Sequence, residues 1–144
     1  MSVCYLDTSA VLKRYLSEPL SAEFDAFALA GGHEFMISAL VITEITSALA
    51  RRVRNRDVDP GFADVARQRF QDDLMFCHWG LIEFQASMFS HAATLISTLP
   101  LPLSTLDALH LACALDAPAD ALATADKQLA VAADHAGLQV FPFF

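Results

Sequence analysis

The stretch Val3-Cys4-Tyr5-Leu6-Asp7-Thr8-Ser9 decides the fold class of this chain. Its first four residues form a continuous apolar run, which is typical of a β-strand buried on both faces of a sheet. Asp7 ends the run, and Thr8 and Ser9 can cap a helix that begins near Ala10. A buried strand that leads directly into a helix predicts a parallel sheet covered by helices.

The rest of the chain repeats this alternation of short apolar strands and helices. After the strand at 3–6, the pattern predicts further strands over 35–37, 81–84, 121–123 and 138–141. It predicts helices over 10–18, 21–30, 39–54, 60–77, 85–97, 105–115 and 127–136. This order predicts a three-layer α/β sandwich, with a mostly parallel central sheet of about four to five strands. No repeat or linker interrupts it, so residues 1–144 are predicted to form a single domain.

The composition favours a folded protein of the cytoplasm. The hydrophobic fraction is 55%, with eleven Phe, so disorder is excluded. No apolar run reaches the length of a membrane span, and the start of the chain lacks the basic region of a secretory signal. Cys4, Cys77 and Cys113 are far apart and have no zinc-ligand spacing, so we expect reduced thiols that fill the core.

The basic residues are concentrated in one part of an otherwise acidic chain. The net charge is -8, which argues against a protein that binds nucleic acid over its whole surface. Six of the nine Lys and Arg residues, however, fall between positions 51 and 69: Arg51, Arg52, Arg54, Arg56, Arg67 and Arg69. Two interpretations remain open, a solvated helical face or a local patch that binds phosphates.

Four carboxylates lie inside or beside apolar segments, where an unpaired charge is costly. Asp7 and Asp126 each follow a predicted strand directly, whereas Glu44 and Asp107 lie in predicted helices. Each has a simpler explanation: Asp7 and Asp126 as helix caps, Glu44 as an exposed side chain, and Asp107 as part of a capping box with Ser104. Ligands of parallel sheets bind at the carboxyl ends of the strands, however, where these side chains can converge. Together they predict a site for a hard divalent metal such as Mg²⁺.

Several polar residues beside these carboxylates are candidates for supporting roles. Thr8, Ser9 and Thr124 can orient metal-bound waters, although each can also cap a helix. His110 stands one turn after Asp107, a position that suits proton transfer. A packed or hydrogen-bonded structural role is favoured for His110.

The acidic motifs, in this order and spacing, resemble those of the PIN domain, especially VapC-type toxins of bacterial type II toxin–antitoxin systems. The resemblance covers nearly the whole chain. The first motif is weakly specific, whereas the third and fourth together are strongly specific. The matching positions are Leu6-Asp7-Thr8-Ser9-Ala10, Glu44, Leu106-Asp107-Ala108-Leu109-His110-Leu111-Ala112 and Thr124-Ala125-Asp126-Lys127-Gln128-Leu129.

The resemblance implies a PIN-like sandwich that acts as an endoribonuclease with Mg²⁺, or Mn²⁺ as a substitute. It implies metal-binding roles for four carboxylates, and water-orienting roles for Thr124 or Ser9. Asp120 is a candidate for a further acidic residue that some relatives carry. The implied partners are an RNA substrate and a cognate VapB-type antitoxin, with a homodimer as the common assembly and no membrane. The implied metal ligands are Asp7, Glu44, Asp107 and Asp126.

Other classes of protein fit the residues less well. A haloacid-dehalogenase-like phosphatase needs a second Asp two residues after Asp7, where this chain has Ser9. A phosphoacceptor receiver domain needs an acidic pair after the first strand, and Asp7 stands alone. The remaining alternatives are a PIN-domain nuclease that processes RNA without being a toxin, and a catalytically silent PIN-like binding module.

Overall fold

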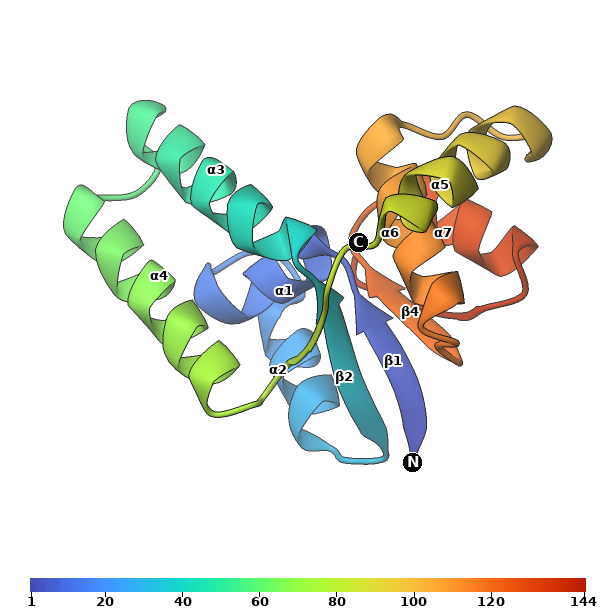
Figure 1. The fold of residues 1–144 in the computed structure, drawn as a ribbon. Helices are drawn as coiled ribbons and strands as arrows, with labels where there is room; N and C mark the ends of the chain where they lie inside the picture. Colours follow the sequence, from blue (N-terminus) through green and yellow to red (C-terminus); the bar gives the residue numbers. More distant parts are fainter.

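The computed structural model describes residues 1–144 and has a five-stranded parallel sheet at its centre (Figure 1). All neighbouring strands pair in parallel, and β1 lies in the middle of the sheet. The sheet therefore confirms the predicted α/β class. In spatial order the strands are β3 (Gly80–Ile82), β2 (His33–Ser38), β1 (Ser2–Leu6), β4 (Ala121–Thr124) and β5 (Gln139–Pro142).

Helices cover both faces of this sheet. Successive side chains of a strand point to opposite faces, so β1 contributes to two cores. Cys4 and Leu6 pack in a core with residues of α1 to α4, whereas Tyr5 packs in a second core with residues of α5 to α7. The result is the three-layer sandwich that the sequence predicts. The helices are α1 (Thr8–Tyr15), α2 (Ser21–Leu29), α3 (Leu40–Arg54), α4 (Pro60–Met75), α5 (Ala86–Thr98), α6 (Thr105–Asp116) and α7 (Lys127–His135).

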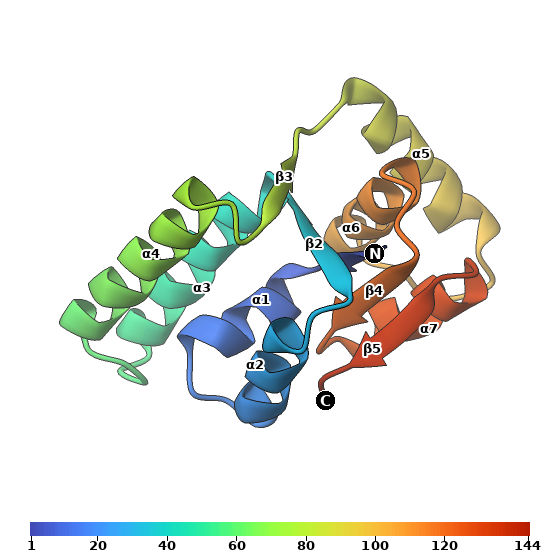
Figure 2. The ribbon, with the colours of Figure 1, turned by 90° about the horizontal axis from the view of Figure 1, so that it is seen from below.

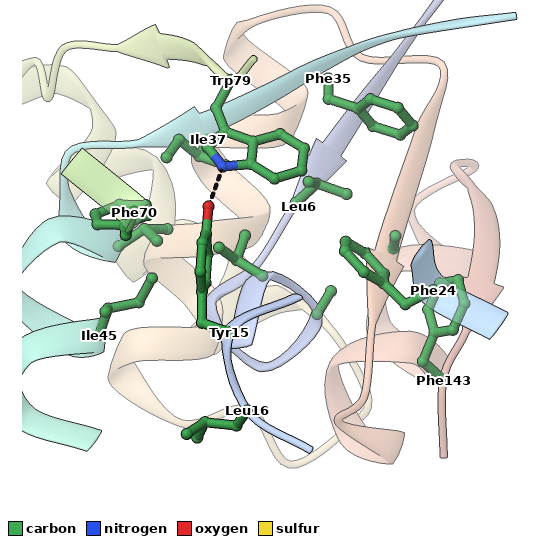
Figure 3. Packing of buried hydrophobic residues seen from close by; sticks show 14 of the residues in the cluster. Leu6, Tyr15, Leu16, Phe24, Phe35, Ile37, Ile45, Phe70, Trp79 and Phe143 are labelled. Atoms are coloured by element: carbon green, nitrogen blue, oxygen red, sulfur yellow. Dashed lines mark hydrogen bonds between the residues drawn. The ribbon is translucent and has the colours of Figure 1, made fainter. Parts of the chain in front are cut away.

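Helices α3 and α4 lie side by side and extend to one side of the sheet (Figures 1 and 2). The apolar stripe of α3 is buried, at Val41, Ile45, Ala48 and Leu49. Tyr15 joins α1 to α4, because its hydroxyl donates to Asp73 Oδ2 (2.6 Å). The same hydroxyl accepts from Trp79 Nε1 (2.8 Å), as Figure 3 shows. The α3–α4 pair is therefore fixed to the helix that follows β1.

The start and end of α1 differ from the prediction. Asp7, rather than Thr8 or Ser9, is the N-cap, because its side chain accepts a hydrogen bond from the Ala10 amide. The helix ends at Tyr15, three residues before Glu18, because Leu16 adopts an extended conformation (φ -120°, ψ 144°). The other predicted elements are present with boundaries shifted by a few residues.

The cysteines only partly follow the prediction. Cys4 and Cys113 are buried thiols, as expected. Cys77 is exposed, so the prediction that it fills the core was wrong. It lies in the turn after α4 with a positive φ of 57°, and its apolar neighbours Met75 and Phe76 are exposed as well. No helix is both long and apolar enough to span a membrane.

Candidate metal centre

Asp7 lies at the carboxyl end of β1, at the centre of the sheet, and only 4% of it is exposed. Its Oδ1 accepts a hydrogen bond from the Ala10 amide (3.0 Å). The Ser9 hydroxyl donates to it at 2.8 Å, and the Thr124 hydroxyl donates to Oδ2 at 2.9 Å. Burial raises the pKa of Asp7, although the charge of His110 and these hydrogen bonds oppose the rise. A buried carboxylate of this kind is stabilised by a nearby cation.

Ser9 and Thr124 also join the two strand ends that carry acidic residues. Ser9 Oγ accepts from the Ala125 amide (2.8 Å), and Thr124 Oγ1 accepts from the Asp126 amide (2.9 Å). Both hydroxyls therefore hold Asp7 against the loop between β4 and α7. Thr124 is fully buried behind Asp7, whereas Ser9 reaches the cavity surface.

Glu44 reaches the same place from α3. Its Oε1 accepts from the Thr8 hydroxyl (2.9 Å) and lies 2.5 Å from His110 Nε2. On the other side of the ring, His110 Nδ1 lies 2.7 Å from Tyr5 Oη. Burial raises the pKa of Glu44, but the hydrogen bonds with His110 and Thr8 outweigh it, so the pKa lies below its usual value. Glu44 is thus held as a carboxylate at the cavity wall.

His110 has the structural role that the sequence favours, since it is 2% exposed and hydrogen-bonded on both ring nitrogens. Its link to Glu44 could not be predicted from the sequence. The two residues are 66 positions apart and belong to helices on opposite faces of the sheet.

Asp107 and Asp126 complete the acidic group from two helix starts. Asp107 lies in the first turn of α6, where its amide donates to Ser104 Oγ (3.3 Å). Burial raises the pKa of Asp107, and repulsion by the charges of Asp126 and Asp7 raises it further. Asp126 is the N-cap of α7, with Oδ1 accepting from the amides of Gln128 and Leu129. Asp107 and Asp126 can therefore lie at helix N-termini, as the simpler explanation has it, and also belong to a shared acidic site.

All four carboxylates line one cavity of about 310 Å³ at the carboxyl edge of the sheet. Asp120 does not belong to this site. It lies at the amino end of β4, where its Oδ2 accepts from the Val3 amide (2.8 Å). The prediction that Asp120 is a further acidic residue of the site was therefore wrong. The other residues that line the cavity are Thr8, Ser9, Leu12, Ser47, Ala48, Arg51, Leu106 and His110.

The donor set fits a hard divalent cation that keeps part of its water shell. No three His, Cys, Asp or Glu side chains are arranged to hold a metal ion by themselves. Mg²⁺ is usually bound through one or two carboxylates and retains several waters, so a complete protein cage is not required. Burial raises the pKa of Asp7 and of Asp107, and the charges of Asp126 and Asp7 raise that of Asp107 further; a cation would stabilise both carboxylates.

The arginines between positions 51 and 69 differ in their surroundings. Arg52 pairs with Glu18 (2.6 Å), Arg67 pairs with Asp64 (3.2 Å), and the Arg69 guanidinium lies 5.9 Å from the centre of the Tyr15 ring. Arg51 lines the cavity beside the carboxylates.

Fold and cavity together define a class of protein: a parallel α/β sandwich with a carboxylate site where the central strands end. The chain belongs to the PIN domain family, whose sequence model matches residues 4–135. This confirms the family to which the four motifs pointed. No curated protein matches the chain in sequence.

Several solved structures have the same fold, and three of them illustrate the likeness. VapC20 of Mycobacterium tuberculosis, described as a sarcin-ricin loop cleaving toxin, is 15% identical over 90% of this chain and 94% of its own, with a TM-score of 0.69. VapBC2 of Rickettsia felis, bound to a DNA fragment from the promoter, is 16% identical over 99% of both chains (TM-score 0.65). FitAcB of Neisseria gonorrhoeae is 18% identical over 96% of both chains (TM-score 0.68). At these identities the likeness demonstrates the fold.

Proposed function

We propose that this chain is a metal-dependent endoribonuclease and the toxin of a type II toxin–antitoxin pair, acting in the cytoplasm. The observation that carries the proposal is the meeting of four carboxylates from separate elements at one cavity of a PIN domain. The neighbouring structures support the toxin role, because one is a toxin described as cleaving the sarcin-ricin loop and another is a VapBC complex.

Asp7, Glu44, Asp107 and Asp126 are the residues that would hold Mg²⁺, with Mn²⁺ as a substitute. The bound cation would supply a lower pKa for an attacking water and positive charge beside the scissile phosphate. Four carboxylates offer enough oxygens for one ion, or for two when substrate phosphates complete the coordination.

The other polar residues of the site position these carboxylates. Ser9 and Thr124 donate to Asp7, and Thr8 donates to Glu44, so the acidic oxygens keep one orientation. Because the Ser9 and Thr124 hydroxyls already donate to Asp7, we propose that they orient the attacking water through Asp7. Fixed ligands avoid reorganisation during the reaction, which is the advantage of a preformed site.

The proposed partners are a VapB-type antitoxin and a second copy of this chain. Complexes of the VapBC and FitAB kind among the neighbouring structures support the first of these. If a small reading frame lies immediately upstream of the gene, its co-expression with this chain, followed by purification through a tag on one protein, tests the antitoxin. Light scattering of the isolated chain tests the homodimer.

The hydrolytic activity is tested with purified protein and a structured RNA in Mg²⁺, Mn²⁺ or EDTA. We expect cleavage with either metal and none in EDTA. Asp7→Asn and Asp107→Asn should abolish cleavage while retaining the circular dichroism spectrum of the wild type. Full activity of either variant would refute the assigned site.

The toxin role requires a separate experiment. Induction of the chain alone should stop growth of the host, and co-induction of the antitoxin that co-purifies with it should restore growth. A chain that cleaves RNA without arresting growth would instead be an RNA-processing PIN nuclease. A chain that neither cleaves RNA nor arrests growth would be a silent PIN-like binding module.

A further inference from the structure

Arg51 is the only Lys or Arg on the cavity wall. Although the wall carries four carboxylates, the Arg51 side chain makes no ion pair within 4.0 Å and no hydrogen bond in the whole chain, unlike Arg52 and Arg67. No carboxylate of the chain is therefore within ion-pair distance of the Arg51 guanidinium.

The position of Arg51 on α3 relates it to Glu44. The two residues are seven positions apart, which is about two helical turns and roughly 10 Å along the axis. Ser47 and Ala48 lie between them on the same helix face and also line the cavity. Because both are small, the wall between the carboxylate and the guanidinium is open.

An RNA strand that enters this cavity meets a strongly negative surface. The four carboxylates repel its phosphates unless cations intervene, and the net charge of -8 adds to the repulsion. A free guanidinium at the edge of the site provides an attraction that a bound metal does not replace. Arginine suits a phosphate in particular, since its planar fork can donate two parallel hydrogen bonds.

We propose that Arg51 binds a phosphate adjacent to the scissile one in single-stranded RNA and thereby fixes the register of the strand along α3. This inference rests on the proposed nuclease function and adds to it a substrate-binding residue outside the acidic motifs. Phosphate contacts position a nucleic acid without reading its sequence, so Arg51 affects where the strand lies rather than which base is preferred.

The test compares Arg51→Ala and Arg51→Lys with Arg54→Ala. Arg54 is an exposed arginine of the same helix that does not line the cavity, so its replacement makes the same change in net charge. Binding of a fluorescent single-stranded RNA is measured in EDTA over a series of salt concentrations. Cleavage kinetics are then measured in Mg²⁺, and Mn²⁺ affinity is measured without RNA.

We expect Arg51→Ala to weaken RNA binding about tenfold and to reduce the slope of log K against log salt by about 0.7, the value for one phosphate of a single strand. Arg51→Lys should retain part of the affinity, because it keeps the charge without the two-pronged geometry. KM should rise more than kcat falls, and Mn²⁺ affinity should not decrease. Arg54→Ala should bind RNA within twofold of the wild type.

Two results would overturn the inference: equal binding by Arg51→Ala and the wild type, or an equal loss in Arg54→Ala, which would indicate a general charge effect. The outcome is separable from the proposed function. If the wild type fails to cleave RNA but only the Arg51 variants lose binding, the hydrolytic proposal fails and the phosphate contact stands. If cleavage is normal and Arg51→Ala changes nothing, only the phosphate contact fails.

Discussion

His110 and Glu44 join the two halves of the sandwich at the cavity: His110 Nε2 lies 2.5 Å from Glu44 Oε1. His110 comes from α6 in the second core, whereas Glu44 comes from α3 in the first. Tyr5 holds the other ring nitrogen at 2.7 Å, so the imidazole has little freedom to move. The position of Glu44, a proposed metal ligand, therefore depends on His110, which is not itself a proposed ligand.

Replacement of His110 should weaken metal binding without unfolding the protein. His110→Ala removes the group that fixes Glu44, and loss of such a support typically lowers metal affinity about tenfold or more. His110→Gln should lose less, because its amide nitrogen can still donate to Glu44. Tyr5→Phe is the matched control, since it removes the hydrogen bond between Tyr5 and His110 and keeps the one between His110 and Glu44. Calorimetric titration with Mn²⁺ measures the metal affinity of the three variants and of the wild type. An unchanged affinity in folded His110→Ala would contradict the proposal that His110 positions Glu44.

Asp107→Asn should stabilise the metal-free protein at neutral pH. Burial and the charges of Asp126 and Asp7 raise the pKa of Asp107 in the folded state, so its ionised form destabilises the fold. Neutral Asn removes that repulsion, and we expect Tm to rise by a few degrees in EDTA. Asp64→Asn, at an exposed surface pair with Arg67, should leave Tm nearly unchanged.

The same variant has a defined pH dependence. A carboxyl whose folded pKa is raised takes up its proton in the folded state first, so its destabilising effect is complete above the folded pKa and fades as the pH falls through that folded pKa. The difference in Tm between Asp107→Asn and the wild type should therefore shrink between pH 7 and pH 4. Addition of Mg²⁺ should raise Tm in the wild type more than in the variant. A variant that is less stable than the wild type in EDTA would show that the repulsion is unimportant.

Asp73 should be a main contributor to the attachment of α4. Its Oδ2 accepts from Arg14 Nε (2.7 Å) and from the Tyr15 hydroxyl (2.6 Å). Burial raises the pKa of Asp73, but these hydrogen bonds outweigh it and hold the pKa below its usual value. Asp73→Asn should lower the free energy of unfolding by about 2 kcal/mol, because a partly buried guanidinium loses its charged partner.

Urea unfolding at several pH values checks this contribution. A lowered folded pKa means that Asp73 stabilises the protein at pH values above its unfolded pKa, and that the contribution is lost as the pH falls through the folded pKa. The difference between Asp73→Asn and the wild type should thus be full at pH 7 and should decrease in acid. An equal loss in Asp64→Asn would mean that any carboxylate of α4 has the same effect.

The parts of the site that could be predicted from the sequence are those encoded locally. An apolar run that stops at Asp7, and another that stops just before Asp126, identify two strand ends, and parallel pairing brings strand ends to one edge. Glu44 and Asp107 were found through their motif context as much as through their spacing, because each also had a plausible surface or capping role.

The parts that could not be predicted depend on tertiary contacts. The contact between His110 and Glu44 spans 66 positions and both faces of the sheet, and no local pattern encodes it. The arginines looked alike in sequence, yet Arg52 forms a salt bridge with Glu18 while Arg51 faces the cavity. Their different roles follow from the direction that each takes on α3, since adjacent residues of a helix do not share a face.

The three thiols provide a test of the fold that does not depend on activity. Burial raises the pKa of Cys4 to about 12 and that of Cys113 to about 11, so neither forms the reactive thiolate at pH 8. Cys77 is exposed after α4. A colorimetric disulfide reagent should therefore label one of the three thiols in the native protein and all three in denaturant. Cys77→Ser should abolish the native labelling, and rapid native labelling of a second thiol would show that one of the two cores is not closed as described.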